Sequence, residues 1–234
     1  MRFNRIPRFF NFSLVQSNGE TWRWRKANVK SRYVVRLFLS TLMLGGLVTG
    51  VIGFVIRWDE FQPYFTDFDI LKILSTLFWL FGVGLIFSLI SQMGFFAYLT
   101  VHRFGLGIFR SIKLWNNVQI VLILFVLFDL VYFRYRAFAD GQGAAPYIID
   151  AALLLIVGLV ISFIKAKQTN KEAFIPALFF MIVVTTIEWV PVLRENEQSW
   201  LYLMLIPLLI CNAYQILILH RLNERSDQEK KPSK

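Results

Sequence analysis

Three carboxylates interrupt otherwise apolar stretches of the chain, and their positions are the first that suggest chemistry. They are Asp129, Asp150 and Glu188. A charged side chain at the centre of a membrane costs at least about 2.5–3.5 kcal/mol, so an acidic residue inside a membrane segment is a candidate functional residue. Each lies near the end of its stretch that we expect to face outward. They could form a small outward-facing polar pocket, or could simply meet interfacial water and nearby arginines. Those arginines are Arg134, Arg136 and Arg194.

A second polar group lies toward the opposite ends of the apolar stretches. Gln92 and Asn116 belong to it, and a basic, aromatic segment lies between them. Gly105 and Gly107 permit a tight turn there, so we expect residues 101–110 to form a loop. Its candidate partner-docking residues are His102, Arg103, Phe104 and Arg110. Such a loop suits either lipid headgroups or a protein partner, and the sequence leaves both interpretations open.

The motifs of metal, cofactor and catalytic sites are missing from the sequence. Cys211 is the only cysteine, which excludes an intrachain disulfide and a multi-cysteine metal site. The two histidines, His102 and His220, are far apart, and there is no His-Glu-x-x-His, Gly-x-Ser-x-Gly or phosphate-binding glycine loop. We therefore predict no metal, no cofactor, no catalytic residues and no enzymatic activity.

The elements that must position these polar residues are six long apolar segments. The chain is 56% hydrophobic and 17% charged, against roughly 25% charged residues in an ordinary soluble domain. About 20 apolar residues in a helix are needed to cross a bilayer. The predicted spans are 33–56, 70–91, 114–133, 147–164, 173–193 and 200–219. The sequence therefore predicts an all-α, polytopic membrane protein, with Asn212 and Gln215 available to form hydrogen bonds between helices.

Lys and Arg are distributed unevenly among the segments between these spans. The net charge is +10, and only five of the 25 basic residues fall on one side of the predicted membrane. These five are Arg57, Lys72, Arg134, Arg136 and Arg194. The positive-inside rule then places both termini in the cytoplasm and the protein in the inner, or cell, membrane. The charge follows the helices, so it does not indicate nucleic-acid binding.

The ends of the chain differ in composition from the six-helix domain, which we place at residues 33–221. Residues 1–32 are basic and aromatic, which suits adsorption to anionic lipid. An equally good interpretation is that the natural start lies near Val29 or Lys30 and that the preceding residues result from a mis-called start. Residues 222–234 are charged, and we expect a disordered cytoplasmic tail there.

Several motifs in residues 30–222 resemble one known family. They begin with Lys30-Ser31-Arg32-Tyr33-Val34-Val35-Arg36-Leu37-Phe38 and continue with Gly53-Phe54-Val55 and Trp58-Asp59-Glu60. The longest is Ser91-Gln92-Met93-Gly94-Phe95-Phe96-Ala97-Tyr98-Leu99-Thr100-Val101-His102-Arg103-Phe104-Gly105. Leu114-Trp115-Asn116 and Phe128-Asp129-Leu130-Val131-Tyr132-Phe133-Arg134 follow. In these stretches the chain resembles the KinB-signalling-pathway activation family of Bacillus-type endospore formers.

The resemblance implies an integral membrane accessory protein in sporulation. Its partner would be a KinB-type membrane histidine kinase that feeds the phosphorelay, and the bilayer would be its surroundings. It supplies no catalytic residues. The alternatives are a small transporter or channel that uses the outward carboxylates, and a purely structural or lipid-organising protein. The sequence leaves open the stimulus, the oligomeric state and whether contact with the kinase is direct.

Overall fold

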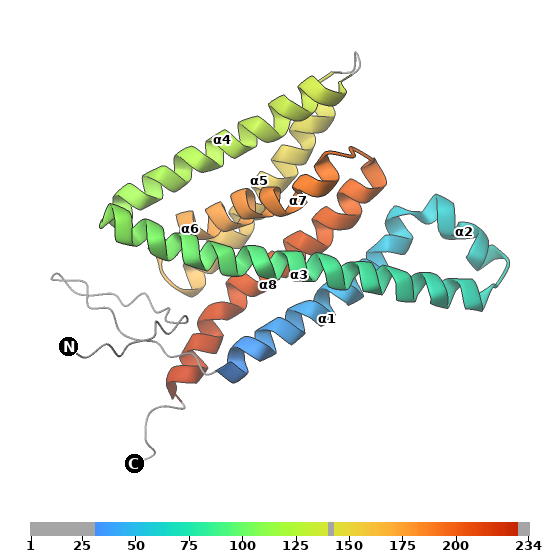
Figure 1. Cartoon of the computed structure of the whole chain (residues 1–234), viewed down its shortest axis with the longest axis horizontal. Helices are drawn as coiled ribbons and strands as arrows, with labels where there is room; N and C mark the ends of the chain where they lie inside the picture. The colour runs from blue at the N-terminus through green and yellow to red at the C-terminus, as the bar shows by residue number, and fades with distance from the viewer. Residues whose placement is uncertain (1–30, 140–142, 229–234) are drawn as a thin grey trace, which may run out of the picture.

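The described part of the computed structural model, residues 31–139 and 143–228, consists of helices and their connections (Figure 1). Side chains are described up to residue 222. No strand occurs in these ranges. The helices are α1 (Ser31–Ile56), α2 (Trp58–Thr66), α3 (Ile70–Phe109), α4 (Ile112–Phe138), α5 (Ala145–Gln168), η1 (Lys171–Ala173), α6 (Phe174–Phe179), η2 (Phe180–Val184), α7 (Thr185–Leu193) and α8 (Gln198–Gln228).

Six helical segments are long and apolar enough to cross a membrane, which confirms the predicted number of spans. The largest departure from the predicted bounds is α3, which continues to Phe109 and has 40 residues. At 1.5 Å per residue it is about 60 Å long, roughly twice the thickness of a hydrocarbon core. A helix of that length must tilt or extend beyond the hydrocarbon core. Figure 1 shows α3 lying obliquely across α1 and α8.

Small residues let α1 and α3 approach closely. A Cβ added at Gly84 would lie 2.5 Å from the backbone oxygen of Gly45, and one added at Gly45 would lie 2.6 Å from the Cβ of Ser88. The Ser88 hydroxyl donates a hydrogen bond to the backbone oxygen of Thr41, at 2.8 Å. Small side chains and cross-helix hydrogen bonds are the usual means of helix association in membranes. This contact fixes α3 against the first helix.

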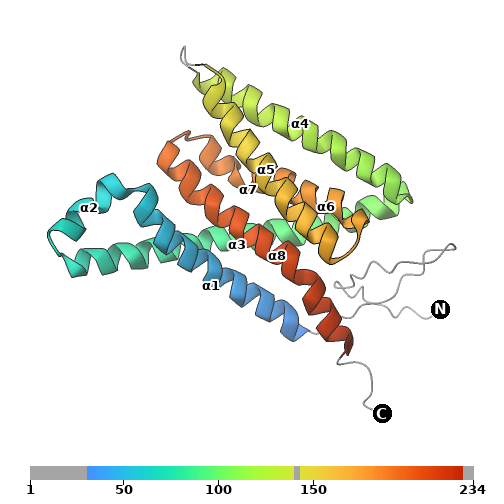
Figure 2. The same cartoon turned by 180° about the vertical axis from the view of Figure 1, so that it is seen from behind.

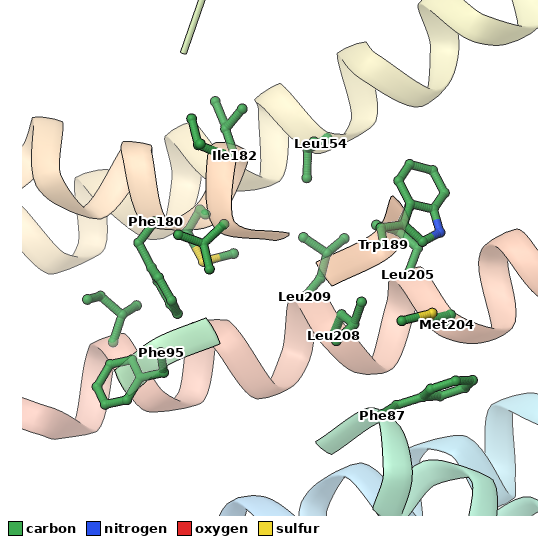
Figure 3. Packing of buried hydrophobic residues seen from close by; sticks show 14 of the residues in the cluster. Phe87, Phe95, Leu154, Phe180, Ile182, Trp189, Met204, Leu205, Leu208 and Leu209 are labelled. Atoms are coloured by element: carbon green, nitrogen blue, oxygen red, sulfur yellow. The ribbon is translucent and has the colours of Figure 1, made fainter. Parts of the chain in front are cut away.

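The fifth span, Lys171–Leu193, is built from four consecutive helical pieces, η1, α6, η2 and α7. A π-helical turn, η2, separates α6 from α7, and all five of its residues are buried. In the most apolar window of this span 72% of residues are buried, and in that of α8 61%, against 22–33% in the other four. Figure 3 shows Phe95, Phe180, Trp189 and Leu208 among the side chains that fill the space around α8. The last two spans therefore form the centre of the bundle.

The first span begins, and the last span ends, at the same end of the molecule. Figures 1 and 2 show the start of α1 close to the end of α8. Residues 223–228 were expected to belong to a disordered tail, but they continue α8 to Gln228. The expected tail beyond them, at 229–234, and the basic segment at 1–30 lie outside the described residues.

An exposed cap begins the long helix α3. The Asp69 carboxylate accepts a hydrogen bond from the backbone nitrogen of Lys72, at 3.1 Å, and lies 3.0 Å from the Lys72 ammonium. A side-chain oxygen at this position satisfies a backbone N–H that has no partner inside the helix. The hydrogen bond from the Lys72 side chain, with that from its backbone, lowers the pKa of Asp69.

Candidate functional site

A network of buried polar side chains joins α3, α7 and α8, with Asn212 at its centre. The Asn212 amide nitrogen donates to a Glu188 carboxylate oxygen, Oε2, at 2.6 Å and to the Thr185 hydroxyl at 2.9 Å. The Ser91 hydroxyl donates to the Asn212 amide oxygen at 2.7 Å and accepts from the Gln215 amide at 2.7 Å. The side chain of Asn212 thus links a carboxylate on one helix to a hydroxyl on another.

The π turn η2 comes immediately before the two residues that α7 contributes. A π turn accommodates one extra residue, which rotates the following helix by about 100° relative to a regular continuation. Thr185 and Glu188 are three residues apart and therefore lie on one face of α7. That face contacts Asn212. Because π turns are frequent at functional sites, the interruption adds weight to this network as a candidate site.

The second oxygen of the Glu188 carboxylate, Oε1, has no hydrogen-bond partner. It lies against Gly94 of α3, where a Cβ would overlap it, and a Cβ there would also lie 3.0 Å from a methyl group of Val184. The Glu188 residue is only 6% exposed. In the described part of the chain no Lys, Arg or His nitrogen lies within ion-pair distance of it. Glu188 is therefore a buried carboxyl group whose hydrogen-bond partner is neutral.

The network continues toward α1 through side chains of α3. The Gln92 amide nitrogen donates to the Ser88 hydroxyl at 3.3 Å, and Ser88 donates to the backbone of α1. The amide oxygens of Gln92 and Gln215 are buried without a partner. The sequence singled out Gln92 and Glu188, and the structure places both among these buried polar groups.

A second buried cluster contains an ion pair. The Arg134 guanidinium of α4 lies 2.7 Å from the Asp150 carboxylate of α5. The Tyr202 hydroxyl of α8 donates to the other oxygen of Asp150 at 2.8 Å, and Arg134 donates to the Asn196 side chain at 3.0 Å. Arg134 also lies over the rings of Tyr147 and Trp189, a cation–π arrangement. For Asp150 the structure thus shows an ion pair with an arginine, one of the interpretations that the sequence left open.

The three carboxylates have different surroundings, which does not favour one shared outward pocket, one of the two interpretations that the sequence left open. Asp150 pairs with Arg134, whereas Glu188 bonds to Asn212. Asp129 is half-buried and makes no hydrogen bond or ion pair within the described ranges. Glu188 does not pair with Arg194. The reason is rotational: each carboxylate projects from its own helix in the direction that the helix register imposes.

The predicted docking loop at 101–110 is also different in the structure. α3 continues through both glycines, and only Arg110 leaves the helical conformation, with φ of 50°. A Cβ on Gly105 would overlap the ring of Trp115, so this glycine serves helix packing and not a turn. The turn to α4 comprises little more than Arg110 and Ser111. The Ser111 hydroxyl accepts a hydrogen bond from the Leu114 backbone nitrogen.

His102 is unavailable for docking, while the other members of the predicted set are exposed. The His102 ring is buried, and its Nδ1 accepts a hydrogen bond from the Trp115 indole at 3.1 Å. Arg103, Phe104 and Arg110 are exposed on the last turns of α3. Asn116, on the next helix, is half-buried, and its amide oxygen has no partner.

Sequence reasoning identified part of the core network and missed the rest. The expectation that Asn212 and Gln215 form hydrogen bonds between helices is confirmed. Ser91 and Thr185 were missed, because a Ser or Thr hydroxyl in a membrane helix commonly bonds to a carbonyl of its own helix and carries no sequence signal. Tyr202 was missed because a tyrosine near the end of a span is usual at the membrane interface. The sequence predicted no metal site. In the described ranges, no three His, Cys, Asp or Glu residues are grouped so that they could hold a metal ion.

These features define a class: a helical protein with six membrane-spanning segments and polar side chains gathered in its core. Residues 45–222 match the model of the family described as KbaA, KinB-signalling pathway activation in sporulation. The chain is 50% identical over 192 residues to the KinB-signaling pathway activation protein of Bacillus subtilis (strain 168). The match covers 82% of this chain and 97% of that relative. The chain belongs to this family. No solved structure matches it.

Proposed function

We propose that this chain is an accessory protein of the cell membrane that activates a KinB-type sensor histidine kinase in sporulation. The observation that carries the proposal is family membership. The matched residues, 45–222, extend from within the first span to the end of the last, so the similarity covers most of the membrane domain and not one motif. The protein itself would not be an enzyme, since its sequence has no catalytic motif.

The activity of such a protein would be exerted through contacts within and beside the membrane. A partner shifts a two-state kinase only if it binds one state more tightly than the other. A difference of about 1–3 kcal/mol changes the populations several-fold to a hundredfold. Direct contact between helices of the two proteins could supply a difference of this size. The KinB-type kinase is therefore the proposed partner.

The exposed end of α3 is the proposed contact surface. Arg103 and Phe104 are adjacent and exposed, and Arg110 is exposed one to two turns later. An arginine can donate two parallel hydrogen bonds to a carboxylate, and an exposed aromatic ring adds apolar area. These three residues, called the α3 patch below, would suit a kinase segment that carries acidic and apolar side chains at the membrane surface.

The first experiment tests the function as a whole. An in-frame deletion of the gene is made in strains with and without the KinB-type kinase, and output is measured with a phosphorelay reporter and by sporulation frequency. We expect the deletion to lower output only where that kinase is present. An equal loss in both strains, or no loss, would contradict the proposal and direct attention to transport.

The second experiment tests the α3 patch. We expect the triple variant Arg103→Ala, Phe104→Ala, Arg110→Ala to lower kinase output several-fold at unchanged membrane abundance. Arg136 and Phe128, which are exposed on α4, supply a matched control. Their replacement by alanine should leave output unchanged. If the α3 patch variant signals like the natural protein, the contact lies elsewhere.

A further inference from the structure

The groups in contact with Glu188 carry no positive charge. On α8 it meets Asn212, and Cys211 is the titratable side chain beside that residue. On α3 it meets Gly94, and the titratable groups of the adjoining turns are Tyr98 and His102. The π turn η2 contributes only apolar side chains.

The guanidinium of Arg134 on α4 is already engaged by other groups. Arg134 lies over the ring of Trp189, the neighbour of Glu188, but its guanidinium pairs with Asp150 and donates to Asn196. It makes no ion pair with Glu188. An ionised Glu188 would therefore be a buried charge without a counter-charge among the described residues.

An unpaired charge in such a setting is very costly. The desolvation of an isolated carboxylate in a medium of low polarity costs so much that the group neutralises instead. The neutralising species must also fit. Oε1 lies against Gly94, where a Cβ would overlap it and would also lie 3.0 Å from a Val184 methyl, so there is little room for the six or more oxygen ligands that hard divalent cations take. A proton needs no such space.

We propose that Glu188 binds a proton and is a neutral carboxylic acid at neutral pH, with its O–H donating to the carboxamide of Asn212. The two amide atoms of an asparagine have nearly the same shape and can exchange places by a 180° rotation. In the protonated state the Asn212 oxygen accepts from Glu188, and the Asn212 nitrogen donates to Ser91. The heavy atoms keep the separations of 2.6 and 2.7 Å that the structure shows.

Release of the proton reverses the direction of these hydrogen bonds. The O–H bond of Glu188 breaks, the proton passes to water, and the electron pair remains on the carboxylate. The Asn212 amide then rotates, so that its nitrogen donates to Glu188 and Thr185 while its oxygen accepts from Ser91. One negative charge is left at the contact of α3, α7 and α8. The site thus links proton binding to the helices of the core.

This inference goes beyond the proposed function and does not rest on it, because the test needs no kinase. The full chain, with its glutamates labelled with ¹³C, is placed in lipid nanodiscs. Infrared spectra then separate protonated glutamic acid from ionised glutamate by the carbonyl stretch. We expect a band of protonated, labelled glutamic acid at neutral pH, when exposed glutamates are ionised. Absence of that band in the natural protein overturns the proposal, whatever the variants do.

Two variants assign the band. Glu188→Gln keeps the shape and an oxygen acceptor for Asn212, and we expect it to remove the band. Glu172→Gln, at an exposed position, is the matched control and should leave the band unchanged. Persistence of the band in Glu188→Gln would assign the proton to another residue and overturn the proposal. A second measurement, replacement of Asn212 by Leu, should shift the frequency of the band, because the acid loses its acceptor.

Discussion

Two carboxyl groups are buried in this bundle, and their surroundings are opposite. Asp150 is 5% exposed and is held by an arginine at 2.7 Å and a tyrosine hydroxyl at 2.8 Å. Glu188 is 6% exposed and receives one hydrogen bond from an amide, while its other oxygen has no partner. Equal burial therefore does not imply equal chemistry. The groups that face the carboxyl decide whether it serves as a fixed charge.

The comparison separates a structural role from a proton-binding role. The buried charges of Asp150 and Arg134 compensate each other, so the removal of either leaves the other charge buried without a partner. At Glu188 a neutral side chain of the same shape satisfies Asn212 equally well. The two sites should therefore respond differently to the same kind of substitution, which the following variants measure.

The largest effect is expected at the ion pair. Arg134→Met leaves the Asp150 charge buried without its partner, and breaking a buried pair in this way costs about 3–5 kcal/mol. Unfolding by detergent titration in mixed micelles measures the loss. Arg136→Met, which removes an exposed arginine from the same helix end, is the control and should change stability by at most about 0.5 kcal/mol. Similar values for the two variants would remove the contrast between the clusters.

A smaller effect is expected where Gly94 meets Glu188. Gly94→Ala places a methyl group where the carboxyl oxygen Oε1 lies, so the carboxyl group or the helix must move. Overpacking of this kind costs about 1–3 kcal/mol. Gly82→Ala in the same helix is the matched control, because nothing lies within 4 Å of the added Cβ. It should stabilise α3 slightly, by about 0.5–1 kcal/mol. Equal losses at both glycines would show that helix flexibility, and not the carboxyl group, sets the cost.

A still smaller effect is expected for Glu188→Gln. The amide retains an oxygen for Asn212 and removes a group that can carry a charge, so we expect a change in unfolding free energy of at most about 1 kcal/mol. Asp150→Asn is the companion variant. This substitution leaves the Arg134 charge buried without its partner, and the loss of unfolding free energy should be several times larger than for Glu188→Gln. A loss at Glu188 as large as that at Asp150 would mean that Glu188 is ionised and paired in the folded protein.

The sequence was sufficient for the architecture, but it left the surroundings of both carboxyl groups open. Long apolar segments require helices in a bilayer, because every backbone polar group must be satisfied within the segment, so the number of spans followed directly. For Asp150 the sequence left open an ion pair with a nearby arginine, contact with interfacial water or an outward polar pocket, and the structure shows the ion pair, with Arg134. The surplus length of α3 was not predicted, because Gly105 and Gly107 are poor helix formers and were interpreted as a turn, whereas α3 continues through both.

The surroundings of Glu188 could not be predicted. The direction in which it projects depends on a π turn four to eight residues earlier, and a π turn has no composition that distinguishes it from an α-helix. The same uncertainty of rotation explains why His102 is buried against Trp115 while its neighbour Arg103 is exposed. Turning a helix about its axis by the angle between two successive residues, about 100°, exchanges buried and exposed positions.

Asp69 offers the smallest effect and completes the comparison, because it is a carboxyl group exposed to solvent. Hydrogen bonds from Lys72 lower the pKa of Asp69. At a pH above the ordinary carboxyl pKa, the ionised Asp69 therefore stabilises the folded state. This stabilisation is lost as the pH falls through the lowered pKa of the folded protein. Asn caps a helix as well as Asp does, so Asp69→Asn removes the charge and keeps the cap. We expect the natural protein to lose stability relative to this variant as the pH falls below about 4. The difference should shrink with added salt, because an exposed ion pair is screened. A difference independent of pH would assign the role of Asp69 to the cap alone, whereas a proton on the buried Glu188 should be insensitive to salt.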